Sequence, residues 1–311
     1  MTQIYFAATP KQWPLYRDTL AQACARLGLD VTITQNAPDP AAVDYIIFEP
    51  DGVIQDFTPF TNCKAVLNLW AGVERLVTNP TLTQPLCRMV DPAMTESMAE
   101  YVTGHVLRYH LGLDGHILNQ DGIWRHDHIP PIARKRPVGI LGMGQLGQAA
   151  ARALHSLNFP VMGWSRSEKS LHGIETYHGE AGLVQLLSRA EILVLLMPRT
   201  PQTENMLNAA RLALMPRGAK IINPGRGPLI DDDALLSALN SGHIGHATLD
   251  VFRIEPLPAQ HPFWGHPNVT VTPHIAADTH PDTAAQVLAE NIRRGEAGLA
   301  FLHIVDRTRG Y

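Results

Sequence analysis

Three glycines place the strongest constraint on what this chain can fold into. Gly142, Gly144 and Gly147 form a G-x-G-x-x-G pattern. A short apolar run, 138–141, precedes them, and a helix-like segment begins at Gln145. Strand, glycine turn and helix in this order are the context that a dinucleotide-binding motif requires.

Each glycine of this turn has a physical task. The first allows the tight turn, the second lets backbone approach a pyrophosphate, and the third lets helix and strand pack closely. The N–H groups at the helix start would then face the phosphates. A turn with a purely structural role is the alternative, and the flanking strand and helix favour cofactor binding over it.

Length and charge narrow the class of protein. A chain of 311 residues is long enough for two domains. Its net charge of -4 provides no basic surface for nucleic acid, and no apolar run approaches the ~20 residues of a membrane span. We expect no signal peptide, because no basic segment precedes an apolar one at the start. Cys24, Cys63 and Cys87 lack metal-ligand spacing, so we expect reduced thiols in a cytoplasmic protein and no metal.

The first ~90 residues alternate strand-like and helix-like segments, which predicts a parallel sheet. They contain no strict glycine fingerprint, so we expect a domain separate from the one at Gly142. A helix over 94–109 would lead into the second domain, and one beginning near Pro281 would return to the first. The expected strands of the first domain lie at 2–8, 31–33, 45–48 and 65–70, with a helix from Trp13 to about Gly28.

The second half continues the alternation with apolar runs that end in polar residues. The runs cover 159–164, 191–196, 219–223, 246–252 and 269–274. Arg226, Asp250 and His274 stand at or just beyond the ends of the last three. Ligands bind at the carboxyl ends of strands in such sheets, so these three residues are candidates for function.

The segment after the run 159–164 indicates the cofactor. An NAD-binding chain carries an Asp or Glu here for the ribose 2′-hydroxyl. This chain has Ser165, Arg166 and Ser167, with Lys169 nearby. Because a guanidinium suits a 2′-phosphate, the segment favours NADP over NAD, although a solvated surface Arg is the plain alternative.

Two further segments leave alternatives open. The loop from Trp70 through Gly72 to Val73 follows a buried strand and could offer backbone N–H groups to an anion, or simply enter a helix. His126 and His128 lie two residues apart in a polar, proline-rich loop, where solvated side chains are favoured over a metal site.

Three residues have the chemistry that reduction of a keto acid needs. Arg226 can engage a carboxylate and a carbonyl. His274 is a proton donor near neutral pH, and Glu255 could pair with it and favour the protonated ring. Alone, each could be a surface Arg, a capping His or a solvated Glu. On a dinucleotide-binding fold, the combination favours catalysis.

These motifs resemble the family of D-isomer-specific 2-hydroxyacid dehydrogenases. The segments 223–227, 250–256 and 273–277 look like its arginine, glutamate and histidine motifs, in the family's order. Pro224 and Gly225 replace the small or polar pair usual before the Arg. Within the family, the segments 164–167, 255–258 and 305–311 are most similar to bacterial glyoxylate/hydroxypyruvate reductases of the A type.

The resemblance implies an α/β fold of two doubly wound parallel-sheet domains. A Rossmann domain for the cofactor, residues 96–279, would be inserted into a flavodoxin-like substrate domain built from 1–95 and 280–311, with the active site in the cleft between them. The implied reaction is the NADPH-dependent reduction of glyoxylate and hydroxypyruvate to glycolate and D-glycerate. Reduction of another short 2-keto acid and cofactor sensing without turnover are the alternatives.

The resemblance also assigns residues. Arg226, Glu255 and His274 would be catalytic, and the substrate would meet Trp70, Ala71, Gly72, Val73, Arg226 and His274. The residues implied to contact the cofactor are Gly142, Met143, Gly144, Gln145, Leu146, Gly147, Trp164, Ser165, Arg166, Ser167, Met197, Pro198, Thr203, Asn223, Pro224, Asp250 and Ala276. Similar reductases often carry a small residue in place of Trp70, and a bulky ring there would narrow the substrate pocket. A homodimer is implied, with much of its contact from 98–128.

Overall fold

The computed structural model describes residues 1–50, 52–126 and 129–308. The chain divides into two compact units. Unit 1 comprises Met1–Met94 and Thr279–Tyr311, and unit 2 comprises Thr95–Asp278. These boundaries differ by one residue from those expected from the sequence.

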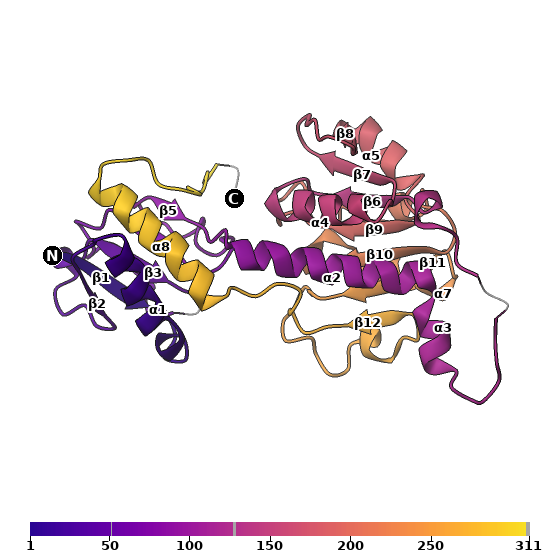
Figure 1. The fold of residues 1–311 in the computed structure, drawn as a ribbon, viewed down its shortest axis with the longest axis horizontal. Coiled ribbons are helices and arrows are strands. Elements are labelled where there is room, and N and C mark those ends of the chain that lie inside the picture. Colours follow the sequence, from indigo (N-terminus) through magenta and orange to yellow (C-terminus); the bar gives the residue numbers. More distant parts are fainter. Residues whose placement is uncertain (51, 127–128, 309–311) are drawn as a thin grey trace. The chain divides into compact units, whose positions relative to one another are not determined.

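Unit 1 contains a five-stranded parallel sheet in the order β2-β1-β3-β4-β5, the flavodoxin-like order (Figure 1). The strands are β1 (Thr2–Ala7), β2 (Val31–Thr34), β3 (Tyr45–Phe48), β4 (Ala65–Asn68) and β5 (Leu86–Cys87). One face packs against α1 (Trp13–Arg26) and α8 (Pro281–Glu296), and the opposite face is covered largely by the loops of 54–82. Alternate residues of β1, β3 and β4 enter the two cores, which explains their continuous apolar sequence.

Unit 2 contains a seven-stranded parallel sheet in the order β12-β11-β10-β9-β6-β7-β8, the doubly wound order of a dinucleotide-binding domain (Figure 1). The strands are β6 (Val138–Leu141), β7 (Val161–Ser165), β8 (Glu175–His178), β9 (Ile192–Leu195), β10 (Ala219–Asn223), β11 (Ile244–Leu249) and β12 (Val269–Val271). The helices are α2 (Pro92–Leu111), which begins in unit 1, and α3 (Leu113–Leu118), α4 (Gln145–Ser156), α5 (Gly179–Leu187), α6 (Ala209–Leu212) and α7 (Asp232–Asn240). One core lies against α2 and α4, and the other lies against α5, α6 and α7.

The predicted α/β class with two doubly wound sheets is confirmed, and the differences are local. Two strands escaped prediction because β5 has only two residues and β8 is largely exposed, with no apolar run. β4 ends at Asn68 and β12 at Val271, so the segments after them are loops rather than strand ends. No helix among the described residues is long and apolar enough to cross a membrane.

The glycine turn joins β6 to α4 and has the geometry that its sequence predicts. Gly142 has a φ of 107°, in the region that favours glycine. A Cβ on Gly147 would lie 1.9 Å from the carbonyl oxygen of Gly142, so helix and turn are in direct backbone contact. A Cβ on Gly144 would meet nothing within 4 Å. The first and third glycines are therefore required by the fold, whereas the second faces open space.

Candidate active site

The start of α4 offers backbone donors beside the open space at Gly144. The first turn of a helix leaves its N–H groups without partners in the helix, and α4 begins at Gln145 with Gly144 as its N-cap. Gln148 donates its backbone N–H to the carbonyl of Gly144 at 3.0 Å. The residues of this turn therefore fit a pyrophosphate, which would occupy the space that the missing side chain leaves.

The loop after β7 is joined to the glycine turn by Lys169. Its Nζ donates to the carbonyl of Met143 at 2.6 Å, and the side chain of Met143 is buried against Gly163 of β7. Ser165 Oγ donates to the carbonyl of Ser167 at 2.7 Å, which closes the turn that carries Arg166. Arg166 is exposed at this turn. The guanidinium and the turn that holds it thus lie at the carboxyl end of β7.

A hydroxyl shapes the loop after β9. Thr203 Oγ1 accepts the backbone N–H of Thr200 at 2.8 Å and donates to the carbonyl of Pro198 at 2.8 Å. Met197, which begins this loop, is buried. The loop is therefore held in one conformation by its own side chain.

Asn223, the last residue of β10, orders the turn that presents Arg226. Its Nδ2 donates to the carbonyl of Arg226 at 3.0 Å, and its Oδ1 accepts the N–H of Gly225 at 3.2 Å. A Cβ on Gly227 would lie 2.0 Å from the carbonyl carbon of Phe252. The arginine segment and the glutamate segment are therefore in backbone contact, which places Arg226 near Glu255.

Asp250, beyond the end of β11, is a buried carboxylate that holds the segment around His274. Its exposed fraction is 0%. One oxygen accepts the hydroxyl of Thr272 at 2.6 Å and the N–H of Ile275 at 2.9 Å, and the other accepts the N–H of Ala276 at 3.0 Å. Its carbonyl accepts the N–H of His274 at 2.8 Å.

His274 and Glu255 form a direct pair. Nδ1 of His274 lies 2.7 Å from Oε2 of Glu255, and Oε1 accepts the N–H of Phe252 at 2.8 Å. No hydrogen bond among the described residues uses Nε2 of His274. Nε2 is therefore the ring atom available for a proton transfer.

The pair shifts the pKa of both members. The hydrogen bond with Glu255 raises the pKa of His274 above its usual value, against the effects of burial and of the Arg226 charge. Burial acts to raise the pKa of Glu255. Hydrogen bonds from His274 and Phe252, together with the charges of His274 and Arg226, outweigh burial and lower it. The geometry favours an imidazolium beside a carboxylate.

The loop after β4 in unit 1 carries the residues predicted to meet the substrate. No hydrogen bond among the described residues takes up the backbone N–H of Gly72 or Val73. Trp70 is partly buried and packs against the core beneath α1 and α8. The loop thus has two adjacent donors, as an anion site requires.

Several predicted site residues have buried side chains, so they shape the site from within the protein. Among the residues implied to contact the cofactor, these are Met143, Trp164, Ser165, Met197, Asn223, Pro224, Asp250 and Ala276. The indole of Trp164 donates to the carbonyl of Gly179 at 2.9 Å. Their contact with the cofactor stays a prediction, and it concerns their backbone atoms.

Two residues that support Asp250 were not predicted from the sequence. Thr272 and its partner Tyr101, whose hydroxyls lie 2.7 Å apart, support Asp250, yet they stand 171 positions apart and share no motif. Of the two histidines considered for a metal, His126 is exposed and His128 lies outside the described residues. Within the part of the chain that the structure describes, no group of three His, Cys, Asp or Glu residues could hold a metal ion.

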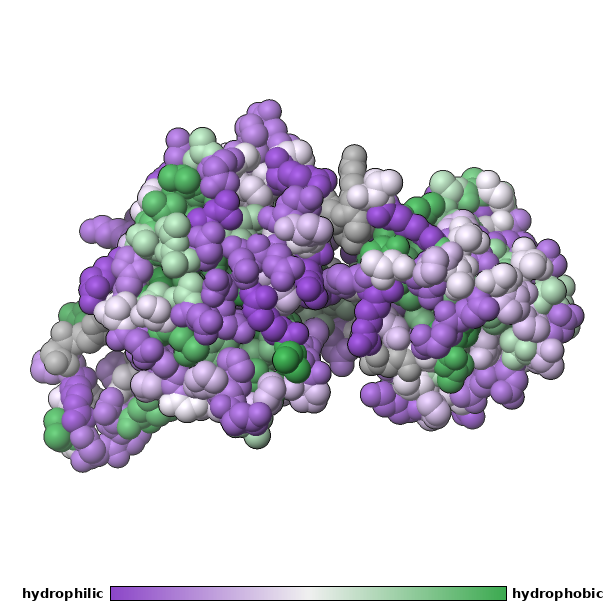
Figure 2. All heavy atoms as spheres, turned by 180° about the vertical axis from the view of Figure 1, so that it is seen from behind, coloured by the Kyte–Doolittle hydropathy of each residue, from purple (hydrophilic) through white to green (hydrophobic). Residues whose placement is uncertain are grey.

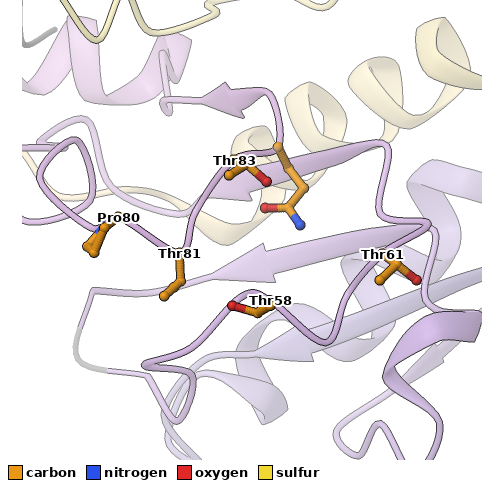
Figure 3. A pocket seen from close by; sticks show the side chains of 6 residues that line it. Thr58, Thr61, Pro80, Thr81 and Thr83 are labelled. Carbon is orange, nitrogen blue, oxygen red and sulfur yellow. The ribbon is translucent and has the colours of Figure 1, made fainter.

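A pocket in unit 1 has none of these residues in its lining. It is lined by Thr58, Thr61, Pro80, Thr81, Thr83 and Gln84 (Figure 3). The lining has hydroxyl and amide groups but no charged side chain. It contains none of the groups that proton or hydride transfer needs, so we assign it no part in the chemistry of the site.

Comparisons with known proteins show the family of this chain. The family model for the D-isomer specific 2-hydroxyacid dehydrogenase NAD binding domain matches residues 109–276. Glyoxylate/hydroxypyruvate reductase A of Yersinia enterocolitica is 40% identical over 260 residues, which cover 80% of this chain and 82% of that protein. The chain belongs to the D-isomer specific 2-hydroxyacid dehydrogenase family and is an oxidoreductase of that class, as predicted.

Solved structures show the same relationship. A D-isomer specific 2-hydroxyacid dehydrogenase from Xanthobacter autotrophicus Py2, in complex with NADPH and MES, has a TM-score of 0.90 and 42% identity, over 100% of this chain and 99% of that chain. The NADPH-dependent glyoxylate/hydroxypyruvate reductase of Sinorhizobium meliloti, in complex with NADP and sulfate, has a TM-score of 0.87 and 34% identity over 100% of both chains.

Replacement of Glu255 tests the electrostatic pairing. We expect Glu255→Gln to lower the pKa of His274 toward its usual value, because the amide carries no charge. Titration of the His274 ring by NMR, assigned with a His274→Gln spectrum, measures this. The wild-type ring should keep its proton to higher pH, and the stability that the pair contributes should be lost as the pH rises through that raised pKa.

Glu204→Gln is the matched control for this titration. Glu204 is an exposed carboxylate of the same unit that lies 3.6 Å from Arg253. It should leave the titration of His274 unchanged. An equal pKa of His274 in the wild type and in Glu255→Gln would contradict the pairing.

Proposed function

We propose that this protein uses NADPH to reduce glyoxylate to glycolate and hydroxypyruvate to D-glycerate. The observation that carries the proposal is the His274–Glu255 pair, which leaves Nε2 available beside the charge of Arg226. The Yersinia enterocolitica relative is named for these two substrates, and the Sinorhizobium meliloti structure carries the same name. Reduction of another short 2-keto acid is the alternative, since Trp70 could narrow the substrate pocket.

The substrate carboxylate would bind to the N–H groups of Gly72 and Val73, which have no other partner among the described residues. Arg226 would engage the carboxylate and the keto oxygen, and its charge would polarise the carbonyl. A dinucleotide held by the glycine turn supplies a hydride to the keto carbon when it is bound.

His274 would complete the reaction. As the carbonyl carbon gains the hydride, the C–O π electrons move to oxygen, and the Nε2 proton of His274 neutralises the alkoxide. Glu255 stays ionised and stabilises the imidazolium before that transfer. The sum is one keto acid, one hydride and one proton giving one 2-hydroxy acid.

The choice of NADPH depends on the turn after β7. Arg166 would pair with the 2′-phosphate, and the exposed hydroxyl of Ser167 would flank it, while Ser165 holds the turn. The Xanthobacter autotrophicus and Sinorhizobium meliloti structures contain NADPH and NADP, which supports this choice. The buried free thiols Cys24, Cys63 and Cys87 support a reducing compartment, and we place the protein in the cytoplasm.

We also propose a homodimer, with contacts from α3 and the loop after it. This segment exposes a series of large apolar side chains, and the lobe at the lower left of Figure 2 shows such patches beside hydrophilic ones. The exposed apolar side chains are Leu111 at the end of α2, and Leu113, Ile117, Leu118, Ile123, Trp124, Ile129 and Ile132 in α3 and the loop. Trp124 is 90% exposed, and a second copy of the chain would cover such a surface.

Initial rates test the reaction. NADPH oxidation should be fast with glyoxylate and hydroxypyruvate, and slower with pyruvate and oxaloacetate. His274→Ala should reduce kcat by about a thousandfold while NADPH binding stays nearly unchanged, because the ring acts on the substrate and not on the cofactor. Equal loss of turnover and cofactor binding would assign His274 a structural role. Tight NADPH binding without turnover on any keto acid would favour a sensor.

Replacement of Arg166 tests the cofactor preference. Arg166→Asp removes the partner of a 2′-phosphate and introduces an acceptor for a 2′-hydroxyl. The ratio of kcat/KM for NADPH to kcat/KM for NADH should therefore fall by about a hundredfold. Arg152→Asp, on α4, is the control and should leave the ratio unchanged. An unaltered ratio in Arg166→Asp would disprove the role of Arg166.

The double variant Leu118→Glu/Trp124→Glu tests the dimer. Charges on the apolar segment should oppose association, so sedimentation velocity should show a dimer for the wild type and a monomer for the variant. Leu15→Glu, at an exposed leucine of α1, should remain dimeric. A wild-type protein that sediments as a monomer would exclude the proposal.

A further inference from the structure

Asn68 is a buried polar residue directly beneath the loop that would bind the substrate carboxylate. It is the last residue of β4, and its exposed fraction is 1%. Its Nδ2 donates to two carbonyls of that loop, Trp70 at 2.8 Å and Gly72 at 2.9 Å. Two acceptors on one nitrogen define which end of the carboxamide faces the loop.

These two bonds determine where the N–H groups of the loop point. In a trans peptide the C=O and the following N–H point in opposite directions. Because the carbonyl of Gly72 points toward Asn68, the N–H of Val73 points away from it. The carbonyl of Trp70 directs the N–H of Ala71 in the same way, and the N–H of Gly72 lies between these two fixed peptides. Asn68 therefore points the N–H groups of Ala71 and Val73 away from itself.

The other end of the carboxamide argues against a role in stability alone. Oδ1 of Asn68 is buried, and no hydrogen bond from the residues that the structure describes reaches it, which is unfavourable for folding. Val66 and Leu67 before it and Leu69 after it are buried and apolar. An apolar side chain would suit the position better if only the core mattered. A side chain with two protons on one terminal atom is what the loop carbonyls require, and neither Ser nor Asp provides it.

We propose that Asn68 is a positioning residue for substrate binding. It holds the carbonyls of Trp70 and Gly72 inward. This points the N–H of Val73 away from Asn68 and, by fixing the peptides on either side of it, limits the orientation of the Gly72 N–H before the substrate arrives. The proposal rests on the proposed function, in which this loop receives the 2-keto acid. It adds that the side-chain amide of Asn68, which does not touch the substrate, controls the affinity for the 2-keto acid by holding the loop.

Two variants of Asn68 test the proposal in the full-length protein with NADPH bound. Asn68→Asp keeps the size but points oxygen at both carbonyls, and Asn68→Ser keeps one donor. For Asn68→Asp we expect KM for glyoxylate to rise about tenfold or more and kcat to change less than about threefold, because ground-state binding is lost and the proton donor is untouched. Asn68→Ser should be intermediate. The dissociation constant of NADPH should stay the same in both.

Asn291→Ala is the matched control. Asn291 is also a buried asparagine of unit 1, with an exposed fraction of 2%, and its side chain bonds the backbone N–H and carbonyl of Leu302. It should lower the melting temperature without changing KM. If Asn68 were only structural, its variants would behave like Asn291→Ala, and a KM within about twofold of wild type in folded Asn68→Asp would overturn the proposal.

A binding measurement separates this inference from the proposed reaction. Oxalate, a two-carbon dicarboxylate, should shift the amide NMR signals of Gly72 and Val73 in the wild type with NADPH present, and Asn68→Asp should need about tenfold more oxalate. Oxalate binding without turnover of any keto acid would refute the reaction but leave the role of Asn68 intact. Equal oxalate binding by wild type and variant, or none by the wild type, would refute the role of Asn68.

Discussion

The hydrogen bonds that the buried side chain of Asp250 accepts hold the segment around His274 in unit 2. His274 has a φ of 56°, in the left-handed region that a side chain with a Cβ adopts at some cost. The conformation persists because Asp250 accepts the two N–H groups that follow His274, and its own carbonyl accepts the N–H of His274. A hydroxyl chain from Tyr101 through Thr272 leads to the same carboxylate. The ring that would donate the proton is thus positioned by backbone that a single buried anion holds.

Side-chain amides hold the backbone of two other loops in a similar way. Asn223 ends β10 and bonds the carbonyl of Arg226, and Asn68 ends β4 and bonds the carbonyls of its loop. The two residues differ in one respect, since Asn223 uses its oxygen on the N–H of Gly225 whereas the oxygen of Asn68 is unpartnered. In both units a parallel strand delivers a polar residue at its carboxyl end, and that residue determines the conformation of the loop. This is a general way to fix a site on loops while the sheet remains apolar.

The parts of this molecule that sequence could predict are those that local chemistry determines. The turn at Gly142 was predictable because each of its glycines is required by contacts within a few residues. The buried strands were predictable because their apolar runs are continuous. β8 has no such run. Thr272 and Tyr101 belong to no motif, because they matter only through a contact between residues 171 positions apart. Asn68 escaped for the same reason, since a buried asparagine and a solvated one look alike until the loop carbonyls are placed over it. The roles of the individual site residues remain predictions.

Arg226 and His274 would be poorly matched without Glu255. The guanidinium that polarises a carbonyl also opposes protonation of a nearby imidazole, and the charge of Arg226 does lower the pKa of His274. Glu255 reverses that effect through its hydrogen bond at 2.7 Å, and the same contact fixes the ring with Nε2 outward. Without Glu255, burial and the charge of Arg226 would lower the pKa of His274, and the ring would hold its proton less firmly. In the proposed reaction, the carboxylate of Glu255 would therefore be needed because of the charge of Arg226.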